Sequence, residues 1–211
     1  MAFMRKGFFF YLSGILIMTL GIALTIISGL GASPFDSLLV GLHRTFGLTI
    51  GSWEIVVGLV LILGNAVLKR ERPEYFALLT SFFTGIGIDA WLFFIEGWGE
   101  PMSLFGQFAA MMLGVVLMGL GIAAYLQSAF APNPLDRSML VLSELTGWNI
   151  AYTRALINLF LVAAAFYFGG ALGVGTLINA FLTGLFIKWF LPYIAAMKKR
   201  KLEEREGSMA S

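Results

Sequence analysis

The sequence predicts an all-α polytopic membrane protein with six transmembrane helices, two short, partly inserted helices and an inverted 3+3 internal repeat. Three observations lead to this prediction. The 211 residues are 59% hydrophobic, with a mean hydropathy of +0.88, which is far above the average of soluble domains. The apolar stretches run for about 18 residues or more without the alternation of a barrel strand. The two halves of the chain also resemble each other in sequence.

Six apolar stretches are long enough to cross a bilayer, which takes about 20 helical residues. They cover residues 8–29, 51–68, 74–95, 104–130, 150–168 and 173–195. Two further stretches, 34–46 and 134–146, have only thirteen residues each. These are too short to span, so we expect two short helices that enter the membrane only in part.

The basic residues lie almost entirely on one side of these six spans. Six crossings put both termini on the same side, and that side holds 13 of the 14 Lys and Arg residues, with only Arg44 opposite. The other side holds five acidic residues, Asp36, Glu54, Asp89, Glu96 and Glu100. Cytoplasmic loops carry such an excess of positive charge, so we expect both termini in the cytoplasm.

The two halves align when the sequence is shifted by 100 residues. This shift places Met18–Ala23 on Met118–Ala123 and Ser33–Asp36 on Asn133–Asp136, and a shift of 99 places Thr84-Gly85 on Thr183-Gly184. We therefore interpret residues 1–101 and 102–197 as two repeats, each with three spans and one short helix, followed by a basic cytoplasmic tail at 198–211. Because three is an odd number of crossings, the second repeat is expected to be inverted.

Small residues recur every seven positions in the first span of each repeat. They are Gly14, Gly21 and Ser28 in one repeat, and Gly114, Gly121 and Ser128 in the other. Such spacing lets two helix backbones approach closely, which favours a seam between the repeats. The alternative is that these residues face a neighbouring helix of their own repeat.

Each short helix begins with a polar residue, a proline and, two residues later, an aspartate. Ser33 or Asn133 suits the N-cap, proline suits the first helical position, and Asp36 or Asp136 would complete a capping box. Capping alone explains this spacing. The functional interpretation is that both helix starts, 32–36 and 132–136, point toward a shared central cavity, as broken helices do in inverted-repeat transporters.

Other polar residues lie nearer the middle of the spans, where they would line such a cavity or form hydrogen bonds between helices. They are Thr80, Ser81, Thr84, Asn158, Asn179 and Thr183. Four ionisable residues lie toward span ends, where we expect their side chains to reach the membrane interface. These four are Glu54, Asp89, Arg154 and Lys188.

Several functional classes lack the residues they need. The chain has no cysteine and one histidine, so we expect no metal and no cofactor. We find no nucleotide-binding or hydrolase motif and no basic strip for nucleic acid, and we expect no enzyme. An intramembrane enzyme would have only Asp36 and Asp136 as a catalytic pair.

The segments Gly29–Asp36 and Gly175–Asn179 resemble the YitT/YczE-like family of bacterial integral membrane proteins. This resemblance implies a location in the bacterial cytoplasmic membrane but no site residues. Our leading hypothesis is a secondary transporter or channel for a small solute, with the lipid bilayer as its surroundings. Aspartates at both helix starts favour a cationic, zwitterionic or neutral solute over an anion. The alternative is a membrane scaffold that acts through partner proteins, and a homo-oligomer stays open.

Overall fold

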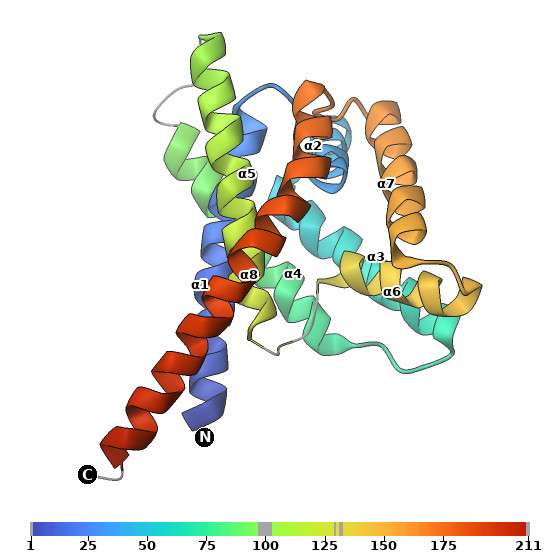
Figure 1. The fold of residues 1–211 in the computed structure, drawn as a ribbon. Helices are drawn as coiled ribbons and strands as arrows, with labels where there is room; N and C mark the ends of the chain where they lie inside the picture. Colours follow the sequence, from blue (N-terminus) through green and yellow to red (C-terminus); the bar gives the residue numbers. More distant parts are fainter. Residues whose placement is uncertain (1, 97–102, 129, 131–132, 210–211) are drawn as a thin grey trace.

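The computed structural model describes residues 2–96, 103–128, 130 and 133–209, and the described part is helical with no strand (Figure 1). The predictions about Glu100 and Pro132 concern residues outside the described part of the chain. The same holds for the side chains of Arg5, Lys6, Glu96, Lys201 and Arg205. The helices in chain order are α1 (Ala2–Ile27), α2 (Pro34–Phe46), α3 (Ile50–Lys69), α4 (Tyr75–Glu96), α5 (Leu104–Leu126), α6 (Pro134–Thr146), α7 (Ile150–Tyr167) and α8 (Val174–Met209).

Six of these helices, all except α2 and α6, are long and apolar enough to cross a membrane. The prediction of six spans and two short helices is therefore confirmed. Two predicted ends were wrong. The fourth span ends at Leu126 instead of residue 130, and the last helix, α8, continues past the predicted span end at residue 195 through the basic tail to Met209. Residues 198–206 are all Lys, Arg, Glu or Leu, and these four are strong helix formers.

The short helices begin and end where local chemistry dictates. Proline occupies the first turn of each, and the Ser33 hydroxyl accepts a hydrogen bond from the Asp36 amide (3.2 Å). The Asn133 side-chain oxygen accepts from the Leu135 amide in the same way (2.9 Å). A glycine with positive φ ends each helix, Gly47 at 76° and Gly147 at 71°.

Helices α1 and α5 pack along most of their length. A Cβ on Gly14 would lie 2.5 Å from the Tyr125 backbone nitrogen, and a Cβ on Gly21 would lie 2.5 Å from the Gly114 carbonyl oxygen. Position numbers rise along α1 as they fall along α5, so the two helices run antiparallel. The seven-residue glycine series predicted from the sequence lies in this contact. Ser28 and Ser128 lie at its two ends: the Ser28 hydroxyl contacts the Met111 sulfur, and the Ser128 carbonyl lies against Gly7.

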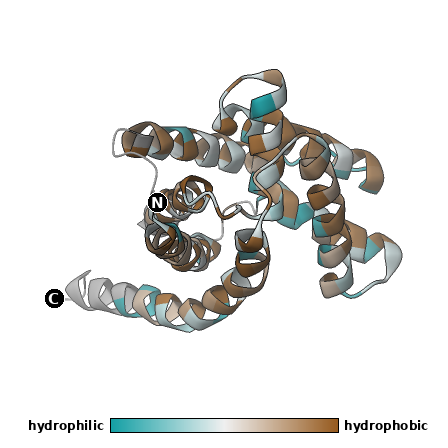
Figure 2. Ribbon diagram, turned by 90° about the horizontal axis from the view of Figure 1, so that it is seen from above, coloured by the Kyte–Doolittle hydropathy of each residue, from teal (hydrophilic) through white to brown (hydrophobic). Residues whose placement is uncertain are grey.

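Helices α4 and α8 pack on this pair, and α2, α3, α6 and α7 form a second group beside it. Helix α4 packs on α1 and α3, α8 on α5, α2 on α7 and α3, and α6 on α3 and α7. Hydrophobic residues predominate along the helices (Figure 2). Many large hydrophobic side chains are exposed, as expected of a protein surrounded by lipid. Helix α1 begins and α8 ends at the same end of the molecule, whereas α2 and α6 lie at opposite ends (Figure 1).

The last two helices of each half are arranged differently. Gly51 on α3 and Gly85 on α4 lie backbone to backbone, so that neither has room for a Cβ. The position matching Gly85 in the second half is Gly184 on α8, where a Cβ would meet no other described atom within 4 Å. Helix α8 instead diverges from α7 and runs along α5 (Figures 1 and 2). The α3–α4 contact of the first half is therefore closed, whereas the matching α7–α8 contact of the second half is open.

Candidate functional site at the starts of the short helices

Both short helices begin against the same helix, α3. Pro134, the first residue of α6, lies against Gly58 of α3. A Cβ added to Gly58 would be 3.7 Å from the Cγ atom of Pro134. Asp36, in the first turn of α2, interacts electrostatically with Glu54, one helical turn away from Gly58 on α3. The α3 segment 54–58 is therefore where the two helix starts approach each other.

Asp36 is almost completely buried, with 3% of its surface exposed. Its carboxylate accepts a hydrogen bond from the Ser33 hydroxyl (2.5 Å). This differs from the expected capping box, in which the aspartate would accept from a backbone amide. The Ser33 hydroxyl thus serves both the Asp36 amide and the Asp36 carboxylate.

Glu54 does not reach the membrane interface, and the prediction that it would do so was wrong. Only 2% of this residue is exposed, and its Oε1 atom has no hydrogen-bond partner among the described residues. The reason is that α2 and α4 cover the face of α3 that carries it. A signal was present in the sequence: Gly51 and Gly58, three residues before and four after Glu54, mark a face that packs closely against another helix.

Helix α4 places two buried hydroxyl groups opposite this face. Gly51 lies against Gly85, and Gly58 lies against Ser81, so Glu54 is level with Thr84 between the two helices. Ser81 and Thr84 are buried, and the structure describes no hydrogen-bond partner for either hydroxyl. Unsatisfied buried polar atoms are uncommon and destabilising, which makes this cluster a candidate for binding.

The remaining candidate on α4, Thr80, faces another direction. Its hydroxyl shares a hydrogen bond with the Tyr11 hydroxyl on α1 (2.9 Å), and both residues are buried. Thr80 therefore connects α1 and α4, one turn from Thr84.

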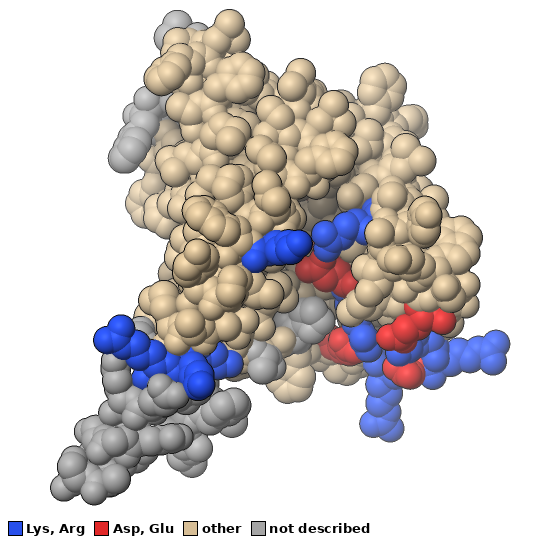
Figure 3. Space-filling view, viewed as in Figure 1, with Lys and Arg blue, Asp and Glu red and all other residues tan. Residues whose placement is uncertain are grey.

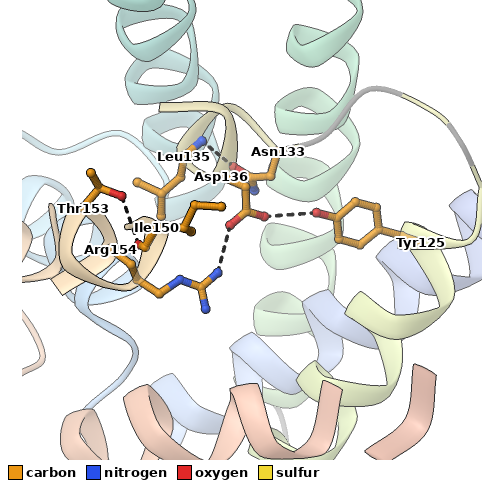
Figure 4. Close-up of polar contacts among 7 residues, drawn as sticks. All are labelled: Tyr125, Asn133, Leu135, Asp136, Ile150, Thr153 and Arg154. Atoms are coloured by element: carbon orange, nitrogen blue, oxygen red, sulfur yellow. Dashed lines mark hydrogen bonds and ion pairs between the residues drawn. The ribbon is translucent and has the colours of Figure 1, made fainter. Parts of the chain in front are cut away.

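The matching positions in the second half form an ion pair. Asp136 accepts a hydrogen bond from the Tyr125 hydroxyl (3.2 Å) and lies 3.6 Å from the Arg154 guanidinium (Figure 4). The two paired side chains are 40% and 52% exposed, so Arg154 is near solvent or headgroups. The shift of 100 residues matches Asp136 with Asp36, and Arg154 with Glu54. One half thus pairs its aspartate with a cation, whereas the other has a second carboxyl group at the position that matches the cation.

Three predicted site residues lie away from α3. Asn179 is buried on α8, where its amide contacts the Met118 sulfur (3.5 Å), and Thr183 donates a hydrogen bond to Asn179 (2.8 Å). Asn158 is partly buried on α7, one turn after Arg154. Asn179 and Thr183 belong to the α5–α8 contact, and Asn158 belongs to α7. Asp36, Glu54, Ser81 and Thr84 instead lie together at α3, and we call these four residues the α3 cluster.

Asp89 caps α3 by accepting hydrogen bonds from the Thr49 hydroxyl (2.6 Å) and the Gly51 amide (2.8 Å). Lys188 is exposed on α8. Asp89 is partly buried against the start of α3, and Lys188 lies near the middle of the apolar segment Val174–Arg200, so their expected position at the membrane interface stays a prediction. Neither residue takes part in the α3 cluster.

Charged residues gather at the end of the molecule that holds both termini (Figure 3). Lys69 pairs with Glu144 (2.9 Å) and Arg137 with Glu74 (2.6 Å), which links α6 to the α3–α4 turn. The hydrogen bond from Lys69 lowers the pKa of the Glu144 carboxyl. These pairs hold both the first turn and the far end of α6 against the α3–α4 turn.

A small pocket of about 20 Å³ opens among these charges, and its lining includes Ile62, Asn65, Pro134 and Arg137. Its volume is enough for about one water molecule. The pocket lies on the Glu54 face of α3, two turns closer to the charged end, and it does not reach Asp36 or Asp136. Among the described residues, no three His, Cys, Asp or Glu side chains are placed to share a metal ion.

Comparison with known proteins identifies the family. The model of a family of unknown function, DUF6198, matches residues 5–192, which is most of the chain. The chain belongs to the DUF6198 family. Similar proteins include the uncharacterized protein YyaS of Bacillus subtilis, at 43% identity over 89% of this chain and 93% of YyaS. The uncharacterized membrane protein YczE of the same species is 35% identical over 87% of this chain and 84% of YczE.

A third relative, an uncharacterized protein of Haemophilus influenzae, is 25% identical over 86% of this chain and 81% of its own length. No solved structure matches this DUF6198 chain. The resemblance to YczE-like proteins seen in the sequence is confirmed, and together with the six apolar helices it supports a multi-pass membrane protein.

Proposed function

We propose that this protein is a small secondary transporter or channel of the bacterial cytoplasmic membrane, with both termini in the cytoplasm. Its site lies near the middle of the membrane, where the two halves meet, and its solute is cationic, zwitterionic or neutral. The observation that carries the proposal is the buried group of Asp36, Glu54, Ser81 and Thr84, in which three side chains have polar atoms without described partners. Polar and ionisable side chains in a membrane interior are expensive and usually functional.

An inverted relation between the halves supports transport. The antiparallel course of α1 and α5, and the positions of α2 and α6 at opposite ends, are what residues 1–101 and 102–197 would show as inverted repeats. Transporters with this symmetry bind solutes near the midplane, at discontinuous helices. Both short helices begin against α3, as such a site requires.

The different closure of the two halves supports alternating access. Inverted repeats exchange two shapes as the site opens first to one side of the membrane and then to the other. Gly51 and Gly85 are in contact in the first half, whereas Gly184 is open in the second. In the opposite state, α8 would close onto Ala151 of α7, and α4 would separate from α3.

The charge distribution supports the orientation. Lys69, Arg137 and the basic residues at 198–200 lie at the end that holds both termini, and Arg44 lies at the end of α2 on the other side. The positive-inside rule places the first group in the cytoplasm. The surrounding lipid covers the apolar outer surface.

The test is solute counterflow in proteoliposomes of the purified protein. A library of labelled amines, amino acids and sugars, each assayed in separate vesicles, should yield at least one solute whose uptake is lost in the double variant Asp36→Asn, Asp136→Asn. The double variant should remain folded and monodisperse. Uptake no faster than in empty liposomes across the library, with stable association of other membrane proteins, would favour the scaffold alternative.

A further inference from the structure

Matching positions in the two halves carry different charges, a carboxyl pair at Asp36 and Glu54 and an ion pair at Asp136 and Arg154. This difference in charge indicates a ligand in the first half. In the second half, Arg154 neutralises Asp136 at the surface. In the first half, Glu54 takes the place of the arginine, and both carboxyl groups are buried, Asp36 at 3% and Glu54 at 2% exposed. Two buried like charges without a counter-ion are strongly unfavourable, so a positive charge must join them.

Among the residues whose side chains the structure describes, no cation near the carboxyl pair is available for this role, because each one is engaged elsewhere. Three helices pack on α3, namely α2, α4 and α6. The other titratable side chains of these three helices lie further along the helices from Asp36 and Glu54, and the basic ones have partners. Arg44 donates to the Gly169 carbonyl, Arg137 pairs with Glu74, Arg154 pairs with Asp136, Asp89 caps α3, Glu144 pairs with Lys69, and His43 contacts the Leu48 carbonyl.

The neighbouring hydroxyl groups provide a second, independent indication. Thr84 is 2% exposed, lies level with Glu54, and has an Oγ1 atom without a described partner. The Ser81 hydroxyl, completely buried one turn away, is in the same state. A hydroxyl can donate to a carboxylate and can accept from a carboxylic acid, so these groups suit a carboxyl that changes its protonation state.

The nearby pocket ends short of the carboxyl pair, which favours the smallest cation as the occupant of the site. The nearby pocket has a volume of about 20 Å³, and buried Ile62 and the close Gly58–Ser81 contact lie between it and Glu54. A hydrated metal ion or an organic cation would need a larger space, whereas a proton needs none. The pocket provides access for water to within two turns of the pair, on the same face of α3.

We propose that Asp36 and Glu54 share one exchangeable proton within the membrane, and that this proton is the coupling ion of the transport cycle. The proton enters as H⁺ from water, converts one carboxylate into a carboxylic acid, and leaves when the halves exchange their shapes. The coupling rests on the proposed transport function, but the proton site does not. Arg154 has the fixed charge that the proton supplies in the first half.

Infrared difference spectroscopy of the protein in lipid vesicles tests the site directly. At neutral pH the wild type should show the carbonyl band of a protonated carboxylic acid, which shifts when the water outside is replaced by D₂O. Glu54→Gln and Asp36→Asn should each remove this band, Glu54→Asp should retain it at a shifted frequency, and Glu144→Gln, which changes an exposed ion-paired carboxyl, should leave it intact. The Glu54→Asp variant separates loss of the proton from loss of the fold.

Three results would overturn the proton site: no such band in the wild type, a band that does not exchange in D₂O, or a band that disappears when choline is replaced by sodium. The last result would identify an alkali-metal ion as the occupant. Proton uptake driven by a potassium diffusion potential, read with a trapped pH dye, then tests the coupling. An exchangeable band together with proton and solute fluxes no faster than in empty liposomes would keep the site and refute the transport function.

Discussion

Replacing Gly21 with alanine should separate α1 from α5. An added Cβ would lie 2.5 Å from the Gly114 carbonyl oxygen and 2.6 Å from the Met118 amide nitrogen, whereas ordinary contact begins at 3.4 Å. Both neighbours are backbone atoms and cannot rotate away. The helices must therefore move apart by roughly 1 Å, and a gap of that size loses about a quarter to a half of the dispersion energy of each contact.

The expected loss is about 1–3 kcal/mol of unfolding free energy, the usual range when atoms are forced into a well-packed core. Gly64→Ala on α3 is the matched control, because its Cβ would meet no described atom within 4 Å. The control should be neutral, or more stable by up to about 1 kcal/mol, since alanine favours helix. Equilibrium unfolding in mixed detergent and SDS micelles measures both. If the two variants unfold at the same SDS fraction, the close antiparallel seam is refuted.

Three other perturbations give distinct results. Arg154→Ala should lower the unfolding free energy by less than about 1 kcal/mol in the same micelle assay, because its ion pair is half exposed; a larger loss would show that the pair is buried. The lowered pKa of Glu144 means that its bond to Lys69 stabilises the fold above the ordinary pKa of 4.5 and is lost as the pH falls through the lower value. The protection of amides at the α3–α4 turn against hydrogen exchange, taken relative to the intrinsic exchange rate at each pH, should therefore fall in acid, and Glu144→Gln should abolish this fall. The double variant Ala151→Cys, Gly184→Cys should form an intrachain disulfide under mild oxidant if α8 closes onto α7, whereas a rigid, open second half would give none.

The short helices show how much local chemistry alone could predict. Their observed bounds, Pro34–Phe46 and Pro134–Thr146, agree with the sequence prediction because proline, an N-cap residue and a terminal glycine fix each end within a few residues. The six spans could also be predicted from the sequence, since a bilayer imposes both the length and the composition of a spanning helix. The end of α8 could not be predicted, because the composition of the basic tail is compatible both with an unstructured extension and with a continued helix.

The burial of Glu54 could not be predicted from the sequence. Its position near the start of a span predicted an interfacial side chain, and only the packing of α2 and α4 on α3 reveals that it is buried beside Asp36. Asp136 illustrates the converse, because its partners Tyr125 and Arg154 come from other helices and replace the expected cap. Contacts between elements distant in sequence decide both cases, and one sequence does not contain them.

The inverted relation of the halves can be tested most directly by labelling Phe46 and Thr146. These positions match at the shift of 100 residues, lie at the exposed ends of α2 and α6, and can be studied as single cysteines because the chain has none of its own. In intact cells, a membrane-impermeant maleimide should label Phe46→Cys, whereas Thr146→Cys should react only after the membrane is permeabilised. Labelling of both cysteines from the same side would contradict the inverted arrangement on which the proposed transport depends.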